Sequence, residues 1–282
     1  MFFLRVGLLL ALVQTPVLAN AASLPGQTKA EVAVESTNLS WAGFYAGIHF
    51  GEGFESNKIR TDFSAYATGY LDLDSALASS RAGTGQIASR SFIGGFHIGH
   101  NWQSDLVVYG LEADVTGFQL GKSRIASGEY LAAGNGVNLF NETKHHFLST
   151  VRARLGVSLD KVLVYGTFGL AVSPFTHNHR FSEYGYDGQV WCGSGGSGNY
   201  CDNGGHADSK LRAGFVFGAG SEFKITKEWS LRAEFLHAQF NAVKGTTNFF
   251  DTIRRAQIAD SPVFHSANAK VDIVRMGVSY GF

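Results

Sequence analysis

Three features of the sequence predict an all-β fold, an eight-stranded antiparallel transmembrane β-barrel with short periplasmic turns and four long extracellular loops. The last thirteen residues alternate between large apolar side chains and small or charged ones. Seven earlier stretches repeat this alternation, and the segments that join them are alternately short and long. Side chains on a strand point to opposite faces in turn, so each stretch has an apolar face for lipid and a polar face for a narrow interior.

The C-terminal stretch gives the clearest case. Its apolar row consists of Val274, Met276, Val278, Tyr280 and Phe282. The opposite row places Arg275 beside glycine and serine, which suits a crowded polar lumen. A soluble sandwich would instead point its apolar row inward. The ending at an aromatic residue resembles the terminal strand of bacterial outer-membrane barrels, which implies that the assembly machinery of that membrane recognises Phe282.

The N-terminal residues 1–21 have the pattern of a cleaved signal peptide. Arg5 supplies the positive charge, residues 6–13 are apolar, and the segments 17–19 and 19–21 both offer a small-residue cleavage site. A membrane-anchoring helix is the alternative, but Gln14 and Pro16 interrupt the apolar run. Residues 22–40 are predicted to be a periplasmic leader, and residues 41–282 the barrel. No later stretch is apolar enough for a transmembrane helix.

Composition agrees with an exported β protein. The chain has 282 residues, of which 45% are hydrophobic and only 16% charged, with 35 glycines. Its formal net charge of zero gives no electrostatic reason to expect a nucleic-acid partner. The expected location is the outer membrane of a Gram-negative bacterium, with the lipids of that membrane as partners.

The predicted strands are about 11–14 residues long, within reach of a tilted strand that spans a membrane. Short turns are expected at Ser104-Asp105, Asp160-Lys161 and Thr226-Lys227. The alternation is weakest in the fifth strand. In chain order the eight strands cover residues 41–51, 90–102, 106–116, 147–159, 162–174, 211–225, 228–240 and 270–282.

The predicted lumen face is rich in charge. An arginine at the midplane facing lipid would cost about 2–4 kcal/mol, whereas opposite charges inside the barrel can pair. A soluble eight-stranded barrel of the lipocalin kind would have an apolar lumen instead. We therefore predict a filled core and no wide channel. The charged lumen residues are Glu112, Asp114, Arg152, Arg154, Arg212, Glu222, Arg232, Glu234 and Arg275.

The two cysteines, Cys192 and Cys201, lie in a stretch rich in glycine and serine. In an oxidising compartment they are expected to form a disulfide that closes a small loop, worth roughly 2–3 kcal/mol in the chain-entropy model. A zinc site is the alternative. It would need more ligands, and His206 is the nearest candidate.

Several motifs together resemble the small outer-membrane proteins of alphaproteobacteria, a family that includes the major surface antigens of Brucella and the hemin-binding proteins of Bartonella. The motifs are WAGFYAG at 41–47, GHNWQ at 99–103, VYGLEAD at 108–114, VRARLG at 151–156 and RMGVSYGF at 275–282. They extend from the first strand to the last but leave out the long loops. The resemblance implies a barrel exposed at the cell surface, and hemin binding if the chain belongs to that branch.

Histidines are the main candidates for a ligand site. We predict that His145, His146, His177, His179 and His206 lie in or beside extracellular loops and bind hemin at the outer rim. The Asp160-Lys161 turn should place residue 159 opposite 162, which brings 145–146 level with 175–176. Neutral imidazole can hold heme iron, so heme is the expected ligand. Histidines also occur at membrane interfaces without any ligand. His49 and His97 are expected to face the lumen and to form hydrogen bonds there.

The sequence thus favours a surface barrel that binds hemin. The alternative is a structural or adhesive surface protein that binds host ligands and no small molecule. No catalytic motif is recognisable, so enzyme activity is not expected.

Overall fold

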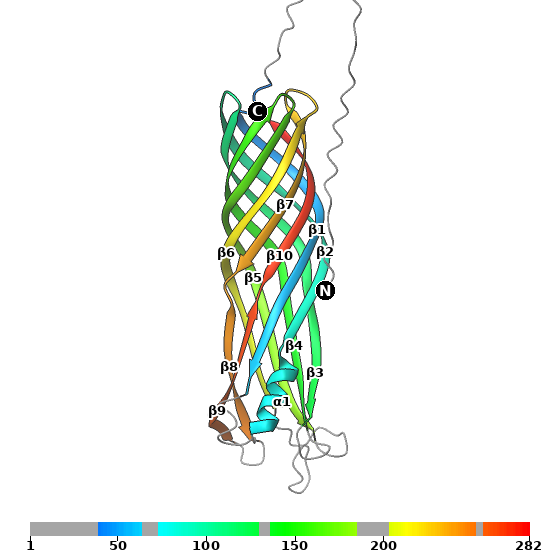
Figure 1. The fold of residues 1–282 in the computed structure, drawn as a ribbon, viewed down its shortest axis with the longest axis vertical. Coiled ribbons are helices and arrows are strands. Elements are labelled where there is room, and N and C mark those ends of the chain that lie inside the picture. Colours follow the sequence, from blue (N-terminus) through cyan, green and yellow to red (C-terminus); the bar gives the residue numbers. More distant parts are fainter. Residues whose placement is uncertain (1–38, 64–72, 130–135, 185–202, 252–255) are drawn as a thin grey trace, which may run out of the picture. The chain divides into compact units, whose positions relative to one another are not determined.

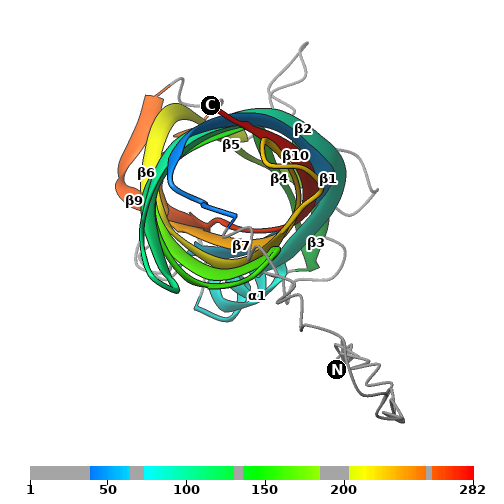
Figure 2. The ribbon, with the colours of Figure 1, turned by 90° about the horizontal axis from the view of Figure 1, so that it is seen from above.

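The computed structural model describes residues 39–63, 73–129, 136–184, 203–251 and 256–282. These residues form the eight-stranded antiparallel barrel predicted from the sequence (Figures 1 and 2). Cys192 and Cys201, the signal segment 1–21 and nearly all of the leader 22–40 lie outside the described residues. The described part contains no helix long and apolar enough to cross a membrane.

Seven long strands and one helix come first along the chain, followed by a hairpin and the closing strand. The elements are β1 (Gly43–Asp62), α1 (Leu73–Gly83), β2 (Gly85–Ser104), β3 (Val107–Glu129), β4 (Gly136–Leu159), β5 (Val162–Tyr184), β6 (Asn203–Lys224), β7 (Trp229–Phe240), β8 (Val243–Asp251), β9 (Ala256–Asn268) and β10 (Lys270–Gly281).

The ring closes between its first and last strands. β10 pairs with β1 from Tyr45 opposite Gly281 to Glu55 opposite Val271, and with β7 on its other edge. The backbone N–H of Phe282 donates to the carbonyl of Phe44 at 2.9 Å. The C-terminal aromatic residue therefore lies next to the start of the first strand, as the terminal alternation predicts.

The short turns have the geometry expected of tight hairpins. Asp105 and Asp160 have positive φ angles of 50° and 55°, a left-handed conformation that aspartate tolerates better than most residues. Leu159 lies opposite Val162, so the predicted register of β4 and β5 is confirmed, and His145 pairs with Phe175.

The strands from β1 to β6 are longer than predicted, at 20 to 24 residues each. The predicted boundaries match only the membrane half. Beyond Phe54 on β1, for example, the outward positions hold Lys58 and Arg60 instead of apolar residues. Outside the membrane the outward positions become largely polar, and the inward positions mix apolar and polar residues, so the alternation disappears although the strand continues. Much of the predicted loop sequence is therefore strand.

Three more elements at the extracellular end were not predicted. Helix α1 packs its buried side, which includes Ala76 and Ser79, against the barrel end. β8 continues from β7 after two residues, and β9 leads into β10 across Ala269. β9 pairs with the outer part of β1 and with β8. At the extracellular end, the two strands of this hairpin thus extend the wall of the barrel beyond β7 and β10.

An apolar belt surrounds the other half of the barrel. Exposed apolar side chains cover it on all eight strands of the ring, for example Phe92 at 85% exposure and Leu211 at 67%. Such side chains would be costly in water and are stable against lipid hydrocarbon. The belt fixes the half of the barrel that lies in the membrane.

Candidate functional site

A network of buried charges fills the lumen at the level of the belt. Arg152 of β4 lies at its centre: its guanidinium forms a very close ion pair with Glu112 and lies 2.7 Å from Asp114 and 2.9 Å from Glu234. Arg275 of β10 contacts the same Asp114 and Glu234 at 3.2 and 2.6 Å. The arginine of the C-terminal strand thus reaches carboxylates on both sides of the barrel.

The second part of this network is built on Arg154 and Arg232. Glu222 lies 2.8 Å from the guanidinium of Arg154 and 3.3 Å from that of Arg232, while Glu112 lies 2.8 Å from Arg232. Four arginines and four carboxylates are therefore buried together. Their formal charges cancel, which satisfies the general condition for burying ions.

The ninth predicted member, Arg212, is placed differently. It pairs in register with Ser173, farther towards the extracellular end of the barrel, and it is only partly buried. Its position on the inward row of β6 follows the alternation, but its height along the strand separates it from the other eight charges.

Neutral residues complete the network, and the charge pattern alone does not mark them. The Tyr45 hydroxyl donates to Glu112 at 2.8 Å and accepts from Arg154 at 3.0 Å. Arg232 donates to the Tyr165 hydroxyl at 3.0 Å. His49 and His97 face the lumen, and their rings lie within hydrogen-bonding distance of Thr116 and Ser279 at 2.9 and 2.8 Å. The positions of His49 and His97 are those predicted from the sequence. Tyr45 and Tyr165 also occupy inward positions of the alternation, which is the signal that could have found them.

An apolar layer lies above the charges, towards the extracellular end. Buried apolar side chains from most strands meet there, and buried polar side chains such as Ser173 lie among them. It includes Ile93, Leu120, Leu148, Phe175, Leu236, Phe240 and Ile273. The layer borders a second polar region, because the ring of Phe175 contacts that of His145 with centroids 4.6 Å apart.

That second polar region is a histidine layer, which we define as His145, His177, His179 and His265 with the polar groups around them. His145 lies 3.0 Å from the carboxylate of Glu55, and its other ring nitrogen lies 3.1 Å from the Ser173 hydroxyl. His179 lies 2.8 Å from the side-chain oxygen of Asn141. All four imidazoles are buried in the lumen.

Three of these imidazoles are in ring contact. The ring of His265 stacks on that of His179 with centroids 4.7 Å apart, and lies 5.7 Å from the ring of His177. His265 comes from β9 and the other two from β5. The closed barrel brings them together across the lumen, although they are more than eighty positions apart in the sequence.

The prediction that the candidate histidines lie in or beside extracellular loops is wrong for the described ones. His145 and His146 belong to β4, and His177 and His179 to β5. His146 sits where the register of β4 and β5 shifts, between His145 and Ser149, and it is exposed on the outside. His206 pairs with His179 across β5 and β6, and its side chain is outside the described set.

An apolar cap covers the histidine layer at the extracellular end. Phe63 and Phe181 meet edge to face with centroids 5.9 Å apart, and Ala76 of α1 packs against the same cluster with Val137, Leu139 and Val263. Within the described residues, no group of three histidine, cysteine or carboxylate side chains has the geometry of a metal site.

The closed ring, the outward apolar belt and the polar filled lumen define an outer-membrane β-barrel protein. The chain belongs to the family described as the outer membrane protein beta-barrel domain, whose model matches residues 7–282. Membership confirms the resemblance and the outer-membrane location inferred from the sequence.

Relatives of known location agree. The chain is 28% identical over 258 residues to the 31 kDa outer-membrane immunogenic protein of Brucella melitensis, which covers 91% of this chain and 90% of that protein. It is 26% identical to the 25 kDa outer-membrane immunogenic protein of Brucella abortus, over 86% of this chain and 80% of the relative.

Among solved structures, the outer membrane protein OprG of Pseudomonas aeruginosa matches 86% of this chain and 97% of its own, at 12% identity and a TM-score of 0.42. The outer membrane protease OmpT of Escherichia coli matches at 11% identity over 85% and 97% of the two chains, with a TM-score of 0.45.

Proposed function

We propose that this outer-membrane protein binds hemin in the extracellular half of its barrel, and that it is a binding protein and not an enzyme. The observation that supports this best is the ring contact among His177, His179 and His265. Imidazole nitrogen is a common axial ligand of heme iron. A cluster of imidazoles offers such a ligand together with neighbours that can hydrogen-bond.

The surroundings of these histidines suit a flat apolar ring. Phe175 lies parallel to His177, with an angle of 10° between the rings and 6.4 Å between their centroids. Phe63 and Phe181 lie on the other side, in the apolar cap. A porphyrin that enters from outside would displace the cap and α1 and replace their apolar contacts with its own.

Two of the histidines predicted to bind hemin fit less well. Both ring nitrogens of His145 already lie near polar partners, Glu55 and Ser173. His146 is on the outer wall and cannot reach the same ligand. We therefore assign iron binding to His177, His179 and His265, and we treat His145 as a structural neighbour.

The charge network supports a holding function over transport. Arg152 and Arg275 are fully buried and fill the lumen below the histidine layer. A hemin bound above them would have no open path to the periplasm, because an eight-stranded barrel is only wide enough for its own side chains.

Titration of the refolded protein with hemin tests the proposal. A shifted Soret band is expected for the wild type. Of the single variants His177→Ala, His179→Ala and His265→Ala, each one that removes an imidazole bound to the iron should weaken hemin binding by about tenfold or more. Heat-modifiable gel mobility confirms that each variant has folded.

His146→Ala is the matched control, because it removes an imidazole that is exposed on the outside of the wall. It should leave the titration unchanged. If the wild type gives no Soret shift, or if His146→Ala weakens binding as much as the three lumen variants do, the histidine layer is not the site. The first result would favour the alternative of an adhesive surface protein without a small ligand.

A further inference from the structure

We propose that the outer wall formed by β1, β9 and β8, above the apolar belt, binds the phosphate groups of an acidic glycolipid of the outer leaflet. Two basic residues flank a serine there, because Ser266 of β9 pairs in register with Arg60 of β1 on one edge and with Lys244 of β8 on the other. Both cations are exposed on the outside of the barrel. The phosphate contacts proposed here come from Arg60, Lys244 and Ser266, which the proposed hemin site does not use, although His265 borders both sites.

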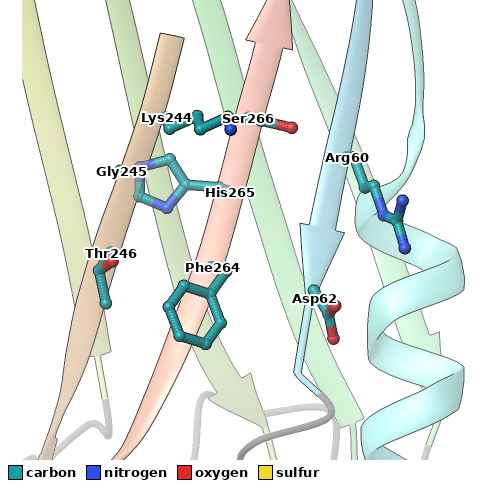
Figure 3. Close-up of a pocket in the computed structure, with 8 residues that line it drawn as sticks. All are labelled: Arg60, Asp62, Lys244, Gly245, Thr246, Phe264, His265 and Ser266. Carbon is teal, nitrogen blue, oxygen red and sulfur yellow. The ribbon is translucent and has the colours of Figure 1, made fainter. Parts of the chain in front are cut away.

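The wall is hollowed at this point. A pocket of about 400 Å³ lies over the three strands, within the size range of ordinary ligand sites. Figure 3 shows the side chains around it. They are Arg60, Asp62, Lys244, Gly245, Thr246, Phe264, His265 and Ser266.

The composition of the pocket favours an anionic ligand with an apolar part. Arg60 and Lys244 together outweigh the single carboxylate, that of Asp62. Arginine can hold a phosphate through two parallel hydrogen bonds, and the Ser266 hydroxyl can add a third. Phe264 is 47% exposed although it lies outside the belt, and it offers a flat face to a sugar ring.

The height of the basic residues favours a glycolipid over a simple phospholipid. Phe54 is the last belt residue on β1, and Arg60 follows six residues later, about 20 Å along the tilted strand. Lys58 is exposed between them on the same face, and Lys270 is exposed at the start of β10. Positive charges therefore occur at several heights, as a headgroup with phosphates on more than one sugar would require.

The wall of β4 and β5 provides a contrast. Its exposed Lys144 is 3.0 Å from the carboxylate of Glu142, which also accepts a hydrogen bond from Asn178 at 2.9 Å. The hydrogen bonds from Asn178 and Lys144 hold the pKa of the Glu142 carboxyl below its usual range. At neutral pH this lysine is already paired with a carboxylate, so it is a suitable control.

The test measures binding of bis-phosphorylated lipid A to the refolded full chain in zwitterionic detergent. The double variant Arg60→Gln/Lys244→Gln should weaken binding by about tenfold, the sum of two partly exposed charge contacts. Lys144→Gln should bind within about twofold of wild type, because the Lys144 ammonium group is already paired with Glu142 of the same chain. Affinity should fall as salt is added.

Three results would overturn the proposal. They are unchanged binding in the double variant, an equal loss in Lys144→Gln, and equal binding of dephosphorylated lipid A. If heparin binds with the same dependence on Arg60 and Lys244 and displaces the lipid, the site recognises a soluble polyanion instead. If inorganic phosphate alone displaces it, the site binds a free anion. The double variant should keep the wild-type hemin titration and heat-modifiable mobility, which separates this proposal from the hemin proposal.

Discussion

The charge network and the histidine layer are two polar regions of one lumen, and they differ in the kind of group that they contain. In the network every carboxylate lies within ion-pair distance of at least one arginine, and the four formal charges of each sign cancel. The histidine layer consists of imidazoles in ring contact, with the carboxylate of Glu55 beside His145. A balanced set of ions stabilises a fixed structure, whereas imidazoles in ring contact can exchange that contact for a ligand.

The largest expected effect comes from removing the centre of the network. Arg152→Met leaves three carboxylates, Glu112, Asp114 and Glu234, with fewer cations in a buried site. We expect a loss of about 3–5 kcal/mol in the free energy of unfolding, or failure to refold. Urea unfolding in lipid vesicles measures it. Arg212→Met, which changes a partly buried arginine outside the network, is the control, and an equal loss in both variants would contradict the comparison.

A smaller loss is expected from a substitution that disturbs the network without touching a charge. Gly169 lies opposite Arg152, and a Cβ there would come within 2.0 Å of the Val151 carbonyl oxygen and 2.6 Å of the Arg152 Cα. Gly169→Ala should cost about 1–3 kcal/mol, the usual range for overpacking. Gly166→Ala is the control, because its nearest contact would be 3.8 Å away. Equal unfolding curves for the two variants would show that the strands have room to move.

In the histidine layer the expected loss of stability is smaller still. His145→Ala removes the imidazole beside Glu55, although Ser89 and Asn57 still donate to that carboxylate at 2.7 and 2.6 Å. The free energy of unfolding should fall by about 1–2 kcal/mol. The Soret shift on titration with hemin should be unchanged, because we assign iron binding to other histidines. Loss of the Soret shift in a folded His145→Ala protein would move the site towards Glu55.

The smallest effect is expected outside the lumen. His146→Ala should change the free energy of unfolding by no more than about 0.5 kcal/mol, as is usual for exposed side chains away from special features. A larger change would mean that the register shift near His145 depends on this residue, and chemical denaturation of the same proteoliposomes would detect it.

The membrane half of the barrel could be predicted because lipid outside and polar groups inside impose a two-residue period. That period located Arg275, Glu112 and Arg152 on inward positions before any partner was known. The extracellular half could not be predicted in the same way. Water wets its outer face, so Lys58 and Arg60 on β1 interrupt the alternation without ending the strand.

The candidate sites, too, could be predicted from the sequence only in part. The hairpin at Asp160-Lys161 was enough to place His145 opposite Phe175, because register follows from a tight turn. The contact of His179 with His265 could not be inferred, since it depends on closure of β1 against β9 and on the curvature of the wall. The outer pocket likewise needs β1 to lie beside the hairpin of β8 and β9, which comes from a distant part of the chain.

By itself the sequence determined the number of membrane strands, their faces, their order around the ring and the location of the protein, because each follows from a local period or a short turn. Only the tertiary structure decided how far along the barrel axis each inward residue lies. Those positions determine which charges meet Arg152, why Arg212 lies outside the network, and that the histidines lie inside the lumen beneath an apolar cap. The position of a residue along the axis depends on how far neighbouring strands are staggered, and this stagger is set by closure of the whole ring.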